Sequence, residues 1–270
     1  MRSPIVLLFV LALLSSSFAQ HGDDIYMQVD YMKTLEGAHD DYIWMENMIY
    51  KPIHQERINT GEIVGWYLYE VQYPSGADTE YDFVTLTAYA NFSLMDEFGT
   101  PYSEILSKAH PDKSEEEIAK YARDTRKLVK SEVIKSYERF PLNPDKPAKS
   151  LLVDYMKVAP VNDALYRRME SEIWQPLHKK RKDLNHIVSW GLYELMFPGG
   201  MNYPYNYATA TGFKSWDMIK DSWPEGIWKD VHPSATQAEL EQRAHEIRDL
   251  VSSQIWKLVD YTTAPTTASN

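Results

Sequence analysis

The 270-residue chain contains no cysteine. Disulfide bonds and thiolate metal sites are therefore excluded in any compartment. Positive charge is scarce as well, since 28 Lys and Arg stand against 39 Asp and Glu and leave a formal net charge of -11. Nucleic acids and anionic membranes both reward basic patches, so this charge argues against either as a partner. A small molecule remains the expected class of partner.

Long apolar runs and diagnostic catalytic motifs are absent after the first twenty residues. No later segment has the roughly 20 consecutive apolar residues that span a bilayer. The sequence contains no G-x-G-x-x-G, Walker loop, G-x-S-x-G or H-E-x-x-H. Its histidines show no metal-ligand spacing. We therefore predict no cofactor and no metal from motifs.

The first residues have the pattern of a secretory signal peptide. Arg2 precedes the apolar run Ile5–Leu14, and Ser17 and Ala19 are small residues where a signal peptidase cuts. The apolar run is about half as long as a membrane span. We expect cleavage after Ala19, a secreted or periplasmic protein, and no membrane insertion after cleavage.

The rest of the chain is a duplication. The segment VDYMK at Val29–Lys33 recurs at Val153–Lys157, and the two halves align at an offset of 124 residues. Between Val29 and Pro74, 19 of 46 positions are identical to their counterparts. We expect a first repeat at 20–137, a semi-rigid linker with three prolines at 138–150, a second repeat at 151–261, and a disordered tail at 262–270.

One half predicts the order β-α-β-β-α-β, which is the ferredoxin-like unit. The second helix begins with an S-x-x-E capping box. The expected elements are a strand around Val29–Lys33, a helix from Asp40 to before Gly61, strands at Ile63–Val71 and Phe83–Tyr89, a helix at Ser114–Val129, and a final strand near Val133–Tyr137.

Two such units in tandem resemble the dimeric α/β-barrel superfamily. The resemblance implies an α+β fold in which two tandem ferredoxin-like βαββαβ units form one intramolecular pseudo-two-fold α/β barrel, and thus a monomer with an internal pseudo-dimer. The pattern W-x-P-x-H…R…G-W-x-L-Y-E also resembles exported Bacteroidota proteins of unassigned function. Neither resemblance carries a diagnostic catalytic motif.

Residues repeated in both halves mark positions that both copies need. On a helical wheel the repeated face of the first helix includes Met45, Ile49 and Ile53, which we expect to pack on the sheet. Proline lacks a backbone N–H, so it kinks or restarts a helix. The residues to which we assign structural roles are Pro52, Pro176, Trp66, Trp190, Arg57 and Arg181.

Glu46 and Glu170 lie in the face expected to be buried, where an unpaired carboxylate is costly. One interpretation is structural, with the carboxylate paired to Arg57 or a lysine, or bound to backbone N–H groups. The other interpretation is catalytic, as a general acid or base with a raised pKa. The sequence leaves both open.

His54 and His178 follow the two prolines and border the same face. His54 lies about 12 Å along a helix from Glu46, too far for a direct hydrogen bond. A neutral histidine beside a helix break can organise hydrogen bonds, act as a base or bind a metal. We expect these histidines to tie the helix to its own sheet, with a position inside the barrel as the alternative.

Alternation along the strands sorts the residues of each strand into two faces, one toward the barrel interior and one toward the helices. We expect the face with aromatic and hydroxyl residues to line an amphipathic cavity, and the face with small residues to contact the helices. The alternative is that these aromatic residues simply fill the core. The expected ligand-binding residues are Tyr69, Tyr193, Thr85, Thr209, Thr87, Thr211, Tyr89 and Phe213.

Three functions remain open. The first is a protein that binds a small amphipathic or aromatic ligand in the barrel. The second is an enzyme, because the superfamily resemblance implies a cofactor-independent oxygenase or cyclase, or a haem protein, with His54 or His178 and Glu46 or Glu170 as candidate catalytic residues. The third is a structural envelope protein. An active site usually decays in one copy of a duplication, whereas these histidines and glutamates survive in both.

Overall fold

The computed structural model describes residues 24–96, 99–140, 146–221 and 223–264. The expected signal peptide and most of the expected tail lie outside these residues. Within the described part of the chain, none of the helices has the length and apolarity of a membrane span.

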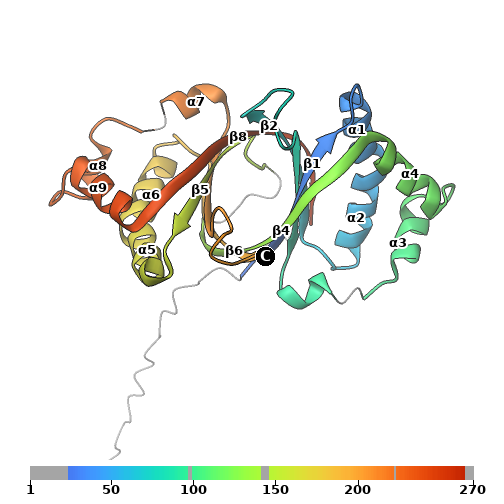
Figure 1. The fold of residues 1–270 in the computed structure, drawn as a ribbon, viewed down its shortest axis with the longest axis horizontal. Helices are drawn as coiled ribbons and strands as arrows, with labels where there is room; N and C mark the ends of the chain where they lie inside the picture. Colours follow the sequence, from blue (N-terminus) through green and yellow to red (C-terminus); the bar gives the residue numbers. More distant parts are fainter. Residues whose placement is uncertain (1–23, 97–98, 141–145, 222, 265–270) are drawn as a thin grey trace, which may run out of the picture.

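The described residues form eight strands that close into one antiparallel barrel (Figure 1). The order around the barrel is β1-β3-β2-β8-β5-β7-β6-β4. The strands are β1 (Tyr26–Thr34), β2 (Gly65–Tyr73), β3 (Phe83–Tyr89), β4 (Arg126–Arg139), β5 (Ser150–Val158), β6 (Ser189–Phe197), β7 (Tyr207–Phe213) and β8 (Arg248–Thr263). Each half contributes four of them, as the ferredoxin-like repeats predict.

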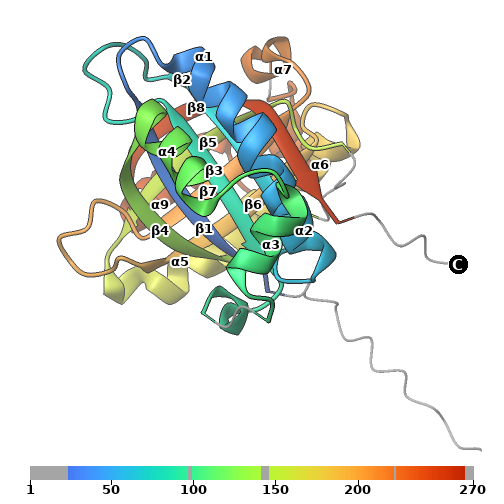
Figure 2. The same cartoon turned by 90° about the vertical axis from the view of Figure 1, so that its right-hand side faces the viewer.

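Helices cover the outer face of each half, so the barrel lies between two helical layers (Figures 1 and 2). The first half carries α1 (His39–Met45), α2 (Lys51–Asn59), the short η2 (Phe92–Met95), α3 (Tyr102–Ala109) and α4 (Glu115–Thr125). The second half carries η3 (Pro160–Asn162), α5 (Asp163–Met169), α6 (Gln175–Asp183), α7 (Trp216–Lys220), α8 (Ile227–Val231) and α9 (Gln237–Ile247). The predicted capping box is confirmed at Ser114 and Glu117.

A π-helical segment joins the two helices before each repeated proline. The segment η1 (Glu46–Tyr50) links α1 to α2, and η4 (Glu170–Trp174) links α5 to α6. Pro52 lies in the first turn of α2, where its missing N–H is tolerated. The residues at these junctions keep helical backbone angles, so the helix continues through a wider turn and does not restart.

The two halves are joined by their last strands. β4 pairs with β1 and with β6, and β8 pairs with β5 and with β2. Both strands are longer than the sequence predicts. The second helix ends at Thr125, and Arg126–Arg139 forms strand because it pairs along β1 and then along β6. β4 therefore extends over the first two residues of the expected linker, and β8 extends over Thr262 and Thr263 of the expected tail.

The buried apolar residues form three clusters. One fills the space between helices and sheet in each half, around Trp66 and Trp190. The third lies inside the barrel and includes Tyr31, Tyr69 and Tyr155. The barrel interior is therefore a space of its own, separate from the core beneath each helical layer.

Candidate functional site

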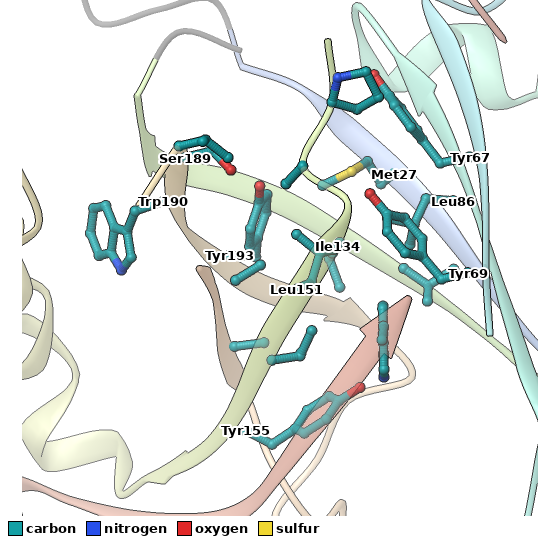
Figure 3. A pocket seen from close by; sticks show the side chains of 18 of the residues that line it. Met27, Tyr67, Tyr69, Leu86, Ile134, Leu151, Tyr155, Ser189, Trp190 and Tyr193 are labelled. Carbon is teal, nitrogen blue, oxygen red and sulfur yellow. The ribbon is translucent and has the colours of Figure 1, made fainter. Parts of the chain in front are cut away.

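A cavity of about 410 Å³ lies inside the barrel (Figure 3). We call it the barrel cavity. Its walls come from both halves and are mainly aliphatic and aromatic. They include Met27, Val29, Tyr31, Tyr67, Tyr69, Leu86, Ile134, Leu151, Val153, Tyr155, Val188, Tyr193, Tyr205, Ala208, Ala210 and Trp256. Binding pockets are commonly apolar spaces of about 300–1,000 Å³ with a few polar groups, so its size suits a small ligand.

The strand phase expected for β3 and β7 is wrong. Tyr69 and Tyr193 line the barrel cavity as predicted, but Leu86 and Ala210 line it from β3 and β7. The residues that alternate with them face the helical layers. These residues are Thr85, Thr87, Tyr89, Thr209, Thr211 and Phe213. The smaller side chains of β3 and β7 therefore lie inside the barrel, in the same space as tyrosines of neighbouring strands.

The two ends of the barrel cavity differ in chemistry. One end lies where β5 and β6 begin and β7 ends, since Leu151 and Ser189 both pair with Gly212. Three lysines line the cavity, and they flank these strand ends or lie in α6: Lys146, Lys182 and Lys214. We call this end the lysine mouth. The described residues that line the cavity include no Asp or Glu.

The opposite end closes on tyrosines around one buried carboxylate, Glu132, which is 1% exposed. Its oxygens accept hydrogen bonds from the hydroxyls of Tyr31, at 2.7 Å, and of Tyr203 and Tyr205. Lys130 Nζ lies 3.2 Å from Glu132 Oε1. We call this group, with Tyr155, the tyrosine floor; the hydroxyl of Tyr155 lies 3.3 Å from that of Tyr31.

Sequence reasoning missed Glu132, although the duplication contains a signal for it. Glu132 aligns with Gln254 and Lys130 aligns with Ser252, so both members of the ion pair differ between the halves together. A paired change of this kind marks a contact that one half has and the other lacks. The tyrosines themselves stay protonated, because burial raises the pKa of Tyr31 and Tyr155 well above the usual value.

A second cavity, of about 310 Å³, lies between the helices and the sheet of the first half. We call it the helix–sheet pocket. It is more polar than the barrel cavity. Its walls include Gln28, Asp30, Glu46, Tyr50, His54, Arg57, Glu62, Trp66, Thr85, Thr87, Tyr89, Tyr102 and Arg126. The structure thus brings the predicted residues Glu46 and His54 to one pocket, outside the barrel.

Glu46 lies at the start of the π-helical segment and is 3% exposed. Burial raises the pKa of its carboxyl to about 7, and Arg126 opposes that rise. Arg126 Nε lies 3.9 Å from Glu46 Oε1. The expected pairing of Glu46 with Arg57 is wrong, because Arg57 binds Glu62 instead, with Nε to Oε1 at 2.6 Å.

His54 does not enter the barrel. Its ring stacks on Trp66 with centroids 5.0 Å apart, and its Nδ1 faces Arg57 Nη1 at 3.4 Å. Arg57 also donates to the Tyr89 hydroxyl at 3.0 Å. Burial, and then the Arg57 charge, lower the pKa of His54 well below its usual value. His54 is therefore neutral and ties α2 to its own sheet, as expected.

In the second half, Trp223 lies over the residues that correspond to walls of this pocket. His178 stacks on Trp190 at 4.9 Å and accepts a hydrogen bond from Arg181 Nη1 at 2.8 Å. Trp223 lies against His178, with centroids 5.6 Å apart, and under the Arg181 guanidinium at 4.1 Å. Four wall positions also become less acidic or less polar, from Gln28, Tyr50, Glu62 and Tyr89 to Leu152, Trp174, His186 and Phe213.

Solved structures share this architecture at low sequence identity. One is a proposed monooxygenase from Lactobacillus acidophilus, with a TM-score of 0.56, 8% identity, and coverage of 90% of this chain and 97% of that chain. Another is a proposed monooxygenase from Fusobacterium nucleatum, with a TM-score of 0.54, 8% identity, and coverage of 90% and 95%. A haem-binding protein from Thermus thermophilus has a TM-score of 0.45, 11% identity, and coverage of 87% and 91%.

These likenesses show the fold alone. The chain has the dimeric α/β-barrel fold, with both halves of the barrel supplied by one polypeptide. No family model matches the sequence, and no curated protein matches it.

The residues beside the two histidines do not fit a haem, which needs a broad apolar slot next to a histidine nitrogen. The helix–sheet pocket around His54 is lined by charged side chains, among them Glu46, Glu62 and Arg126. His178 is 7% exposed and enclosed by tryptophans. Among the described residues there is also no group of three or more His, Asp or Glu side chains that could hold a metal ion.

Proposed function

We propose that this protein binds a small amphipathic molecule with an aromatic or otherwise apolar body inside the barrel cavity. The observation that carries the proposal is the cavity itself, about 410 Å³ of space walled by aliphatic and tyrosine side chains. Close-packed interiors contain few voids larger than a water molecule, so a space of this size is unusual unless something occupies it. Figure 3 shows the side chains of Tyr69, Tyr155 and Tyr193 around this space.

The lysine mouth favours a ligand that carries an acidic group at the end nearest these lysines. Three lysines line the cavity without an acidic residue among its described lining, although the whole chain carries a net charge of -11. A local positive field at a pocket entrance raises the local concentration of anions and their association rate. The proposed ligand is therefore apolar in its body and anionic at its outer end.

A titration with 1-anilinonaphthalene-8-sulfonate, an anionic aromatic dye, tests the proposal. We expect saturable fluorescence enhancement with one site per chain. The variant Ala210→Trp fills the cavity from β7 and should weaken binding at least tenfold. Val161→Trp is the matched control, because Val161 is 89% exposed and is not among the described residues that line the cavity. Equal dye binding by both variants would contradict the proposal.

A second candidate function, that of a cofactor-independent oxygenase that removes a proton from its substrate, is favoured by the helix–sheet pocket. Glu46 has a pKa of about 7 and borders an open space, so it can both donate and accept a proton near neutral pH. Glu170 has a pKa raised to about 7 as well, and in its half Trp223 lies against His178. The pair therefore offers a matched comparison of the same group beside different neighbours.

Oxygen uptake with a panel of electron-rich phenols and anthrones tests this second function. Activity that Glu46→Gln reduces at least tenfold, and that Glu170→Gln leaves unchanged, would support it. Absence of oxygen uptake, or equal effects of the two substitutions, would count against this function and leave ligand binding in the barrel as the proposal.

A further inference from the structure

The hydroxyl groups of the tyrosine floor donate their protons to acceptors within the protein and not toward the barrel cavity. A phenol has one proton to donate and lone pairs that accept. Tyr31 and Tyr205 direct this proton to Glu132. Tyr155 shares a hydrogen bond with Tyr31 and another with Tyr81, so its proton also has acceptors within the protein. All three residues line the cavity, and their hydroxyl protons are directed to acceptors of the protein itself.

The tyrosine floor carries no uncompensated charge. Lys130 Nζ lies 3.2 Å from the Glu132 carboxylate and 4.4 Å from the centroid of the Tyr31 ring. The cation therefore balances the carboxylate and also contacts the face of one phenol. Because the charge is balanced, the floor attracts hydrogen-bond donors, whether neutral or cationic, more than it attracts ions as such.

We propose that the ligand of the barrel cavity carries a hydroxyl or amino group on its inner end, whose proton the oxygens of Tyr31, Tyr155 and Tyr205 accept. This inference rests on the proposed function. A phenol or an aromatic amine meets the requirement. An ether or hydrocarbon end supplies no proton to these oxygens and so forgoes that hydrogen bond. With the lysine mouth at the other end, the ligand class is an aromatic acid with a hydroxyl or amino group opposite the acid.

The second half shows what the floor looks like without the carboxylate. Gln254 stands in the place of Glu132, and its amide accepts from Trp256 Nε1 at 2.8 Å and donates to the Tyr81 hydroxyl at 2.7 Å. An amide both donates and accepts, so it does not force every neighbouring phenol to donate inward. The group of phenol oxygens that can only accept hydrogen bonds from a ligand is therefore specific to the side that carries Glu132 and Lys130.

Calorimetric titration with 4-propylphenol and 4-propylanisole tests the inference, since the two probes differ by a methyl group on the oxygen. We expect the wild-type protein to bind the phenol about tenfold more tightly than the ether. The double variant Lys130→Ser with Glu132→Gln copies the pair found at Ser252 and Gln254, so the fold tolerates these residues in the same setting. In this variant the preference should fall to about threefold or less.

Other outcomes separate this inference from the proposed function. If the wild-type protein binds the naphthalene dye but binds phenol and ether equally, the donor requirement is wrong and ligand binding stands. A double variant that keeps the tenfold preference overturns the role of Glu132. Tyr155→Phe removes one acceptor and should also reduce the preference, which gives a second test if the double variant fails to fold. If the dye does not bind at all, the proposed function fails first.

Discussion

The guanidinium of Arg181 lies over the indole ring of Trp223, 4.1 Å from the ring centroid. In the first half the equivalent Arg57 binds the carboxylate of Glu62 at 2.6 Å and borders an open pocket. Trp223 therefore distinguishes two halves that repeat the same histidine, arginine and glutamate. The repeated residues hold the helix on its sheet in both halves, and in the first half the helix–sheet pocket lies beside them.

Trp223→Ala should open the second half. We expect the free energy of unfolding to fall by about 1–3 kcal/mol, because the indole packs against His178 and Arg181 but is 41% exposed. Urea denaturation followed by circular dichroism measures the change. Trp216→Ala is the matched control, since Trp216 is 42% exposed. A loss no larger than that of the control would show that Trp223 does not support this half.

Glu46→Gln should change how stability depends on pH. The pKa of the Glu46 carboxyl rises from 4.5 to about 7 on folding, so the folded state binds more protons than the unfolded state between these values. Stability therefore falls as pH rises through this window. At about 1.4 kcal/mol per pKa unit, the variant should gain about 3 kcal/mol over wild type between pH 4 and pH 8.

Urea denaturation at several pH values between 4 and 8 measures this difference. The exposed Glu36 gives the control variant Glu36→Gln, which should follow the wild-type curve. A constant difference between Glu46→Gln and wild type across the range would mean that Glu46 does not take up a proton on folding.

His54 and His178 should remain neutral at pH values where an ordinary histidine is charged. Burial, followed by the adjacent arginine, lowers the pKa of both. Each therefore contributes stability that is present above about 6.5, the unfolded pKa, and that is lost as pH falls toward the folded pKa. Nuclear magnetic resonance of the imidazole protons should show no titration between pH 8 and pH 6. His39 should titrate above 6.5, because Asp40 raises its pKa.

Lys182→Glu should weaken binding of the anionic naphthalene dye about threefold or more, since it reverses a charge at the lysine mouth. The loss should shrink as salt is added, because salt screens exposed charges. The exposed Lys229 lies on α8, outside the described lining of the cavity, so Lys229→Glu is the control for net charge. Equal effects of both variants would show that the dye senses only the net charge of the protein.

Local patterns in the sequence predicted much of this fold correctly. The repeated VDYMK segments revealed the duplication, and hydrophobic periodicity gave strand β3 at Phe83–Tyr89 as the structure has it. The capping box at Ser114 and Glu117 gave the start of α4. The strand and the capping box depend on residues within a few positions of one another, and the repeat needs only a comparison of the sequence with itself, so all three can be recognised without a tertiary structure.

The phase of β3 and the length of β4 could not be predicted in the same way. Alternation shows that Thr85 and Leu86 face opposite sides, but it does not say which side is the barrel. The choice is visible only in the closed barrel, where Leu86 shares the interior with tyrosines of β1, β2 and β5. β4 continues to Arg139 because β6 of the other half supplies a pairing partner.

For the candidate sites too, some features were predictable from the sequence and others only from the tertiary structure. The repeats alone predicted that Glu46, His54 and their counterparts matter in both halves, because identity between the halves needs no coordinates. The pocket beside Glu46, the tryptophan that contacts Arg181, and the tyrosines around Glu132 emerged from the folded chain. Tyr31 and Glu132 are 101 residues apart, and Glu132 and Tyr205 are 73 apart. The first contact follows from the pairing of β1 with β4 within one half, and the second follows from barrel closure, which sets β4 beside strands of the other half.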